Sequence, residues 1–441
     1  MSPLTMAIIM VILVVICILT KKVPMNWAMT LIPIICCMGL GYSLTQTSDF
    51  IIAQLATTMR TVGWMLMFGL IFFNMLGQTG LFETLIGGLV KLVGNKMNVI
   101  AVMIMTVIVG GLGFLTANIS TTYLICFPLM IPMYKKFKIR KEYAFILCQT
   151  AIAAMCFLPW GIGVANSAMM AGTDALTLAE ASVPWGLCFI PAIILQIIYF
   201  TSKHKKEQGT LGLPADAVEE TAQAEKKENP NARPKLFWVN LLIFIVTIFC
   251  LAYLKYPAYL VFIIASIVTA AINYPKNWGE MFNKTAMTYY NVLQMMIAIS
   301  IYIAIFNAAP TDGSKISMVK ALADGLVAVF PTVLSKYMYL IFLLLCVVIC
   351  RFVPYQLLNA LYPVFISVGA AFGFTPIQII APFVCNLALA TGFTPVNTSI
   401  YVGAPLSETD VDTVVKMAFP IMNITNVVVI LTAIFTGVLK L

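Results

Sequence analysis

The sequence has little charge. Only 10% of its 441 residues are Asp, Glu, Lys or Arg, while 61% are hydrophobic. A soluble domain carries roughly 25% charged residues. Apolar runs of the length that a membrane helix needs, about 20 residues, recur along the whole chain. The composition therefore excludes a soluble globular protein and predicts an all-α, multi-pass protein of the cell (plasma or inner) membrane.

The residues on which most catalytic and metal sites depend are also scarce. The chain has one histidine, His204, in a hydrophilic stretch, and none of its 11 cysteines forms a Cys-x-x-Cys pair. No serine elbow and no phosphate-binding loop occur. We therefore expect no enzyme, no cofactor and no resident metal, and any transport work must draw on an ion gradient.

One segment interrupts the apolar pattern. Residues 203–235 are charged and almost free of large apolar side chains, which is typical of a solvated linker. Its opening run, "KHKK", predicts a cytoplasmic location, because basic loops stay on that side. The net charge of +9 is mostly loop Lys and Arg, so the bilayer rather than a nucleic acid is the expected partner. The linker separates residues 1–202 from residues 236–441.

The two halves share short motifs in the same order. "FNMLGQTG" (73–80) matches "FNAAPTDG" (306–313), and "FPLMIPMYKKFKI" (127–139) matches "YPVFISVGAAFGF" (362–374). "NSAMMAG" (166–172) matches "NTSIYVG" (397–403). Each match alone is weak, but their common order indicates a duplication.

Residues 97–134 are interrupted by a polar stretch, Thr116 to Thr122, and basic residues lie on both sides of the segment. If both ends are cytoplasmic, the segment is either two full spans or a re-entrant hairpin. The short second arm favours a hairpin. The same reasoning predicts a second hairpin at about 336–371, entering from outside, with its tip at "RFVPYQ" (351–356).

Each half then holds about five transmembrane helices and one hairpin, and an odd number of crossings makes the two repeats inverted. Pro, Gly and Asn within apolar sequence also predict two broken helices, at about 140–172 and 376–404. Hairpins and broken helices in corresponding places of inverted halves indicate a substrate site near the bilayer midplane. Non-helical backbone at that depth survives only where protein or a water-filled cavity satisfies it.

The motifs resemble those of a known family. "TTYLICFPLMIPMYKKFKI", "LPWG" and "TPVNTSIYVGAPLSETDVDTVVK" are similar to the citrate–divalent-metal/proton symporters, a family of the ion transporter superfamily that is related to the divalent anion–sodium symporters. The likeness runs over nearly the whole chain. It implies a homodimeric elevator transporter, in which a domain built from hairpins and broken helices moves against a scaffold.

The resemblance and the breaks together give the candidate ligands. The predicted substrate-binding residues are Asn118, Ser120, Thr121, Thr122, Gly161, Asn166, Arg351, Gln356, Asn397 and Thr398. The predicted cation-binding residues are Asn118, Ser120, Thr394 and Asn397. Arg351 is singled out because burying a charged side chain at membrane depth costs free energy, and because its guanidinium can donate two parallel hydrogen bonds to a carboxylate.

The sequence departs from the citrate–metal pattern at the hairpin tip. Thr116 and Asn118 stand in place of two aspartates, and Asn166 stands in place of an arginine. A site without carboxylates is a poor host for a magnesium or calcium complex.

The sequence thus predicts an ion-coupled symporter for a small organic anion, a di- or tricarboxylate such as citrate or a C4-dicarboxylate. The neutral oxygens at the breaks favour Na⁺ as the coupling ion, whereas the family resemblance favours H⁺. The alternatives are a proton-coupled monocarboxylate carrier, an anion exchanger and an anion channel.

Overall fold

The computed structural model describes residues 1–20, 22–93, 98–212, 230–309, 316–397 and 399–439. Throughout these ranges the structure is helical and contains no β-strand. Six helical segments are long and apolar enough to cross a membrane: Leu44–Gln78, Val99–Thr116, Ala175–Gln208, Pro234–Leu251, Tyr289–Phe306 and Val411–Phe435. The prediction of an all-α multi-pass membrane protein is confirmed.

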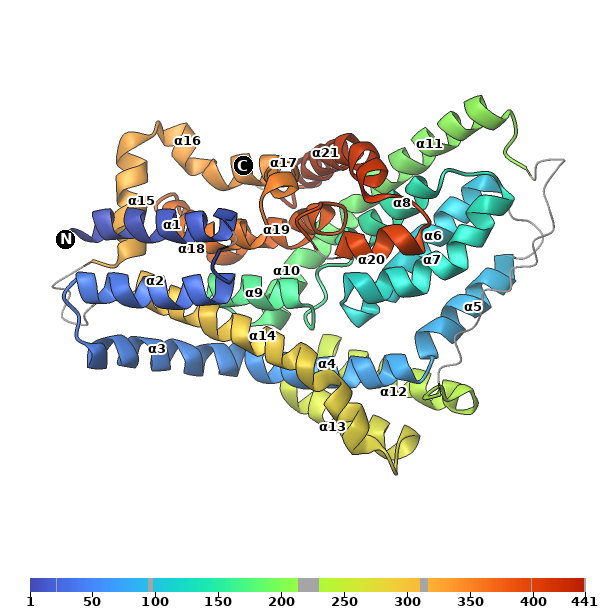
Figure 1. Cartoon of the computed structure of the whole chain (residues 1–441), viewed down its shortest axis with the longest axis horizontal. Coiled ribbons are helices and arrows are strands. Elements are labelled where there is room, and N and C mark those ends of the chain that lie inside the picture. The colour runs from blue at the N-terminus through green and yellow to red at the C-terminus, as the bar shows by residue number, and fades with distance from the viewer. Residues whose placement is uncertain (21, 94–97, 213–229, 310–315, 398, 440–441) are drawn as a thin grey trace.

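Helices α2, α3, α4, α13 and α14 form the lower layer of Figure 1, while α1, α15 and α16 lie above them at the left. In that layer α2 packs on α14, and α4 packs on α13, so that helices from both halves of the chain interleave. The helices of the first half that begin the chain are α1 (Pro3–Thr20), α2 (Met25–Gly39), α3 (Leu44–Thr58), α4 (Trp64–Gln78) and α5 (Leu81–Val93). Those that begin the second half are α12 (Phe237–Ala252), α13 (Ala258–Asn273), α14 (Trp278–Phe306), α15 (Met318–Val329) and α16 (Thr332–Lys336).

The remaining helices form a second group, in the upper part of Figure 1. From the first half they are α6 (Val99–Gly113), α7 (Ile119–Lys136), α8 (Lys141–Ala154), α9 (Ile162–Ala171), α10 (Ala175–Leu187) and α11 (Phe189–Gln208). From the second half they are α17 (Met338–Phe352), α18 (Gln356–Ala370), α19 (Pro376–Thr391), α20 (Ser399–Leu406) and α21 (Val411–Phe435).

Helices of this second group pack in the same order in both halves. The bundle α6–α7–α8 has its counterpart in α17–α18–α19, and α8 meets α19 between them. The short helix of each half packs on the other half: α9 lies against α18, and α20 lies against α7. The two hairpin-like pairs and the two broken helices therefore meet in one place.

Gln149, on α8, joins the two halves at their centre and is fully buried. Its Nε2 donates to the carbonyl oxygen of Ala388, on α19, at 2.7 Å, and its Oε1 accepts from the hydroxyl of Tyr123. The same Tyr123 hydroxyl lies 3.3 Å from the carbonyl oxygen of Gly392, where α19 ends. Side chains of the first half thus satisfy carbonyl groups that the second broken helix leaves without helical partners.

The segment predicted as a linker begins later than its composition indicates. Helix α11 continues to Gln208, and His204 is buried within it. The chain then folds back, because the amide of Val99 donates to the carbonyl of Leu211 at 3.1 Å. At the other end, the amide of Arg233 donates to Thr79 O at 2.8 Å. The described ends of this segment are therefore attached to helices by backbone hydrogen bonds, although many of their residues are exposed.

Candidate substrate-binding site

The tip of the first helix pair is a tight, polar turn. Helix α6 ends in a 3₁₀ turn, Phe114–Thr116, and Ala117 follows in the left-handed conformation with φ of 54°. Asn118 then caps α7, because its Oδ1 accepts from the amide of Thr121 at 2.9 Å. A Cβ at Gly113 would lie 3.1 Å from Thr122, so glycine allows the two arms to approach this closely.

The first broken helix meets this tip. Helix α8 ends at Ala154, and α9 begins after Gly161. Gly161 is the N-cap of α9 and has no side chain, so no side chain caps the first turn of this helix. Between them, the Trp160 indole donates to the carbonyl of Leu115 at 2.9 Å and stacks on Phe73 with ring centroids 4.3 Å apart. Trp160 thereby fixes the break against both the tip and α4.

A cavity of about 310 Å³ lies where these elements converge, and we call it the central cavity. Three helices begin at its wall: α7 with Asn118 to Ser120, α9 with Gly161 to Gly163, and α18 with its N-cap Tyr355. Each helix start carries unpaired N–H groups and a partial positive charge. Three such starts around one cavity favour an anion over a cation in it.

The polar atoms of the cavity wall also favour an anion in the central cavity. No Asp, Glu, Lys or Arg is among the described residues that line it. The Oδ1 atom of Asn359, on α18, is buried and has no hydrogen-bond partner in the described part of the chain, while the hydroxyl of Tyr362, on the same helix, interacts with Ser167 of α9. Buried polar groups in proteins are nearly always paired, so unpaired ones at a cavity wall are available to a ligand.

The sequence analysis did not identify Tyr355, Asn359 or Tyr362. Their spacing of i, i+4 and i+7 places them on one face of α18, a pattern that the sequence "YQLLNALYP" carries. The polar stripe on an otherwise apolar helix was the available signal.

The predicted substrate ligands are distributed as follows. Asn118, Ser120 and Gly161 line the central cavity. Thr122 is buried, and its hydroxyl donates to the carbonyl of Asn118 at 2.8 Å. Asn166 is fully buried on α9, with its Nδ2 4.0 Å from Met295 Sδ, and its Oδ1 has no hydrogen-bond partner among the residues that the structure describes.

Four other predicted substrate ligands belong to the second half, and one of them, Asn397, is also a predicted cation ligand. Arg351 lies in the last turn of α17 with its guanidinium 4.5 Å from the ring centroid of Phe419, and it does not line the central cavity. Its assignment as a carboxylate ligand stays a prediction. Gln356 is the first residue of α18, but its side chain is outside the described part of the structure, as is Thr398.

The predicted cation ligands divide into two places. Asn118 and Ser120 line the central cavity. Thr394 and Asn397, in the second break, bond to each other, with Asn397 Nδ2 3.3 Å from Thr394 Oγ1, and do not line it. A cation site shared by all four stays a prediction.

A second cavity, of about 350 Å³, lies on the other side of the tip, and we call it the side cavity. Asn118 lines both cavities, and Thr121 lines this one. Its remaining polar wall comes from Asn74, Gln78 and Glu83 of the first half and Lys284 and Thr285 of α14. The tip of the first helix pair thus stands between two polar spaces.

A helical membrane fold with broken helices around a central cavity is typical of secondary transporters. A family model described as citrate transporter matches residues 1–393. The chain therefore belongs to the citrate transporter family, CitMHS, and is a transporter rather than an enzyme.

Curated relatives agree with this assignment. The chain is 27% identical over 328 residues to the Mg(2+)/citrate complex secondary transporter of Bacillus subtilis (strain 168), covering 72% of this chain and 73% of the relative. It is 25% identical over 398 residues to the citrate transporter of the same organism, covering 84% and 87%.

Solved structures show the same fold. MtrF of Neisseria gonorrhoeae, described as illuminating a class of antimetabolite efflux pumps, aligns with a TM-score of 0.58 at 14% identity, covering 98% of this chain and 94% of MtrF. The YdaH transporter of Alcanivorax borkumensis aligns with a TM-score of 0.57 at 15% identity, covering 88% of each chain. At these identities the likeness concerns the fold alone.

Proposed function

We propose that this protein is an ion-coupled symporter of a small di- or tricarboxylate, which binds as an anion in the central cavity. The observation that carries the proposal is the convergence of three helix starts, α7, α9 and α18, on one cavity whose described lining includes no acidic side chain. An anion gains there from N–H groups and helix dipoles without meeting a repelling carboxylate.

We further propose that the substrate travels as the free carboxylate rather than as a metal complex. The relative from Bacillus subtilis is described as carrying a Mg(2+)/citrate complex. Magnesium and calcium sites depend on carboxylate oxygens, and the described lining of the central cavity offers amide and hydroxyl oxygens instead.

For the coupling ion we propose Na⁺, held by neutral oxygens near the tip and the second break. Candidate oxygens are those of Asn118, Ser120, Thr394 and Asn397. Neutral oxygens at the ends of broken helices hold Na⁺ in several transporters. Proton coupling is the competing proposal, since a carboxylate substrate can itself carry a proton.

The movement that we propose is an elevator motion in a homodimer built from inverted repeats. Its support is the division into two packed groups: α2, α3 and α4 with α13 and α14 in one, and the hairpin-like pairs with the broken helices in the other. The matched packing order α6–α7–α8 and α17–α18–α19 supports the repeat.

Uptake by proteoliposomes tests the proposal. We expect citrate or a C4-dicarboxylate to enter against its gradient when Na⁺ is present outside, with and without EDTA, and to stop when choline replaces Na⁺. Uptake that follows an imposed proton gradient and ignores Na⁺ overturns the coupling ion. Uptake abolished by EDTA overturns the free-anion form, and flux far above carrier turnover favours a channel.

A further inference from the structure

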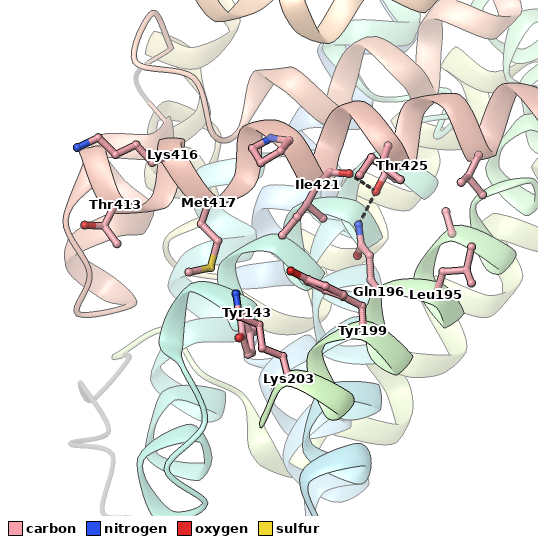
Figure 2. Close-up of a pocket in the computed structure, with 14 residues that line it drawn as sticks. Tyr143, Leu195, Gln196, Tyr199, Lys203, Thr413, Lys416, Met417, Ile421 and Thr425 are labelled. Carbon is pink, nitrogen blue, oxygen red and sulfur yellow. Dashed lines mark hydrogen bonds between the residues drawn. The ribbon is translucent and has the colours of Figure 1, made fainter. Parts of the chain in front are cut away.

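A third pocket, away from the central cavity, lies between α8, α11 and α21 and has a volume of about 770 Å³. We call it the outer groove. Figure 2 shows α21 along one side and α11 along the other. Its walls are mostly aliphatic, with Leu195 on α11 and Ile421 and Ile424 on α21. Leu195 and Ile424 are more than half exposed, so this face meets the bilayer.

The outer groove is amphipathic along its length. Two lysines, Lys203 and Lys416, lie toward one end of it, and Leu195 lies toward the other (Figure 2). Neither ammonium has an ion-pair partner within the described ranges, while the nearby Glu207 pairs with Arg140 at 3.2 Å. The charged end of the groove is therefore open to an external anion.

Tyr143 supplies an unpaired buried donor at the same place. Its side chain is 1% exposed and lines the groove, and its ring stacks on Phe200 with centroids 4.2 Å apart. Its hydroxyl has no hydrogen-bond partner in the described part of the chain. A buried hydroxyl without a partner costs free energy, which a ligand oxygen that accepts from it recovers.

The floor of the groove is held in place by hydrogen bonds. Gln196 Nε2 donates to Thr425 Oγ1 at 2.7 Å, which ties α11 to α21, and to Thr150 Oγ1 at 3.0 Å, which ties α11 to α8. Both threonine hydroxyls donate to carbonyls of their own helices, so they can only accept from Gln196. The groove exists before a ligand enters it.

We propose that the outer groove binds one anionic phospholipid, with an acyl chain along the aliphatic walls and the headgroup at the end of the groove that carries Lys203, Lys416 and Tyr143. A phosphate is a strong acceptor for two ammonium groups and one hydroxyl. The last turns of α11 carry Lys203, Lys205 and Lys206, and basic residues at a helix end favour the side of the membrane whose lipids are anionic. Charge and shape together favour a lipid over a soluble anion.

Thermal unfolding in mixed micelles tests the proposal, because a ligand of the folded state raises the melting temperature. We expect phosphatidylglycerol to stabilise the wild type more than phosphatidylcholine does. The double substitution Lys203→Ala and Lys416→Ala should weaken the apparent affinity for phosphatidylglycerol by roughly tenfold or more. The matched control is Lys205→Ala with Lys206→Ala, which removes the same charge from exposed positions of α11 outside the groove and should leave the affinity unchanged.

Tyr143→Phe separates binding from folding. Since the hydroxyl has no partner among the described residues, this variant should be as stable as the wild type in neutral lipid and should lose several-fold in phosphatidylglycerol affinity. Native mass spectrometry should find one retained anionic lipid per chain, and inorganic phosphate should not compete for it. Equal affinity of the Lys203/Lys416 double variant and its control, or equal stabilisation by both lipids, overturns the proposal. A change of oligomeric state in Ile424→Trp without loss of lipid assigns the groove to a second copy of the chain.

Discussion

At the residue scale, Asn118 has two separable roles. Its Oδ1 caps α7 through the amide of Thr121, and its side chain lines both the central and the side cavity. Aspartate keeps the cap and is favoured at a helix start, but it adds a negative charge where we propose that the anion binds.

We therefore expect Asn118→Asp to fold with a melting temperature close to that of the wild type and to lose uptake by roughly tenfold or more. Asn118→Ala should instead lose about 1 kcal/mol of stability with the cap. Uptake and thermal unfolding of both variants check this. Wild-type uptake of the free carboxylate by Asn118→Asp would contradict the placement of the anion.

Arg351 shows how far a single residue could be understood from the sequence. The sequence predicts a helix break close to Arg351, because the residue before a proline avoids the helical conformation. Val353, which precedes Pro354, is extended in the structure, with φ of −128° and ψ of 140°. What the sequence could not give is the direction of the side chain, which depends on α21 and places the guanidinium over Phe419.

At the scale of elements, the start of α9 offers a test of the cavity. A Cβ at Gly163 would meet nothing within 4 Å, and this glycine lines the central cavity. A Cβ at Gly392, near the end of α19, would instead collide with the Gln149 side chain and the Tyr123 hydroxyl.

We expect Gly163→Leu to fold normally and to block substrate binding, because its side chain extends into the space that the anion needs. Gly163→Ala should fold equally well and retain part of the uptake. Gly392→Ala should lower the melting temperature or prevent folding, because overpacking a filled site commonly costs about 1–3 kcal/mol. Uptake measured beside thermal unfolding distinguishes the two glycines, and a fully active Gly163→Leu variant would argue against this cavity.

The hydrogen bonds of Gln149 join α8 to α19 in the interior. Gln149→Leu keeps much of the volume but removes one of the two side-chain donors to the Ala388 carbonyl, leaving the Thr391 hydroxyl, and deprives Tyr123 of an acceptor. We expect a loss of about 1–3 kcal/mol in unfolding free energy. Tyr123→Phe, which removes one hydroxyl, is the milder control. Denaturation in detergent measures both, and equal stability of Gln149→Leu and the wild type would contradict the bridging role.

The elements themselves were largely predictable, but their convergence was not. Local sequence predicts both the polar tip at Thr116 to Thr122 and the break beginning near Pro159. Asn118 is a favoured helix N-cap, and Gly161 can adopt the conformation that a helix start requires. The N-cap of α18 joins them at the central cavity only through tertiary packing of α9 on α18. Likewise, the charge of residues 203–208 concealed the end of α11, because the helix continues where Glu207 pairs with Arg140.

At the scale of the whole molecule, an ion-pair cluster joins the halves near one end of the helices. Glu408, just after α20, accepts from Lys135 and Lys141, each at 2.6 Å. The Lys135 hydrogen bond, followed by that of Lys141, holds the pKa of Glu408 below its ordinary value of 4.5. All three side chains are partly exposed, so solvent screens the cluster.

A carboxylate with a lowered pKa stabilises the folded protein above its unfolded pKa, and the contribution disappears as the pH falls through the folded value. We expect Glu408→Gln to be less stable than the wild type by about 1 kcal/mol or less above pH 5, with the difference shrinking on acidification and at high salt. Thermal unfolding of both proteins from pH 7 downward measures this. A difference that grows on acidification would contradict the ion-pair origin.

The bridge at Gln149 also bears on how the protein is made. A ribosome completes α8 long before it reaches Ala388, so the first half enters the bilayer with a buried amide whose partner has yet to be synthesised. Until then we expect the nascent first half to remain loosely packed, with chaperones or lipid covering the face of α8 that carries Gln149. The two halves should consequently assemble when translated as separate polypeptides cut within residues 213–229, whereas the first half alone should be degraded.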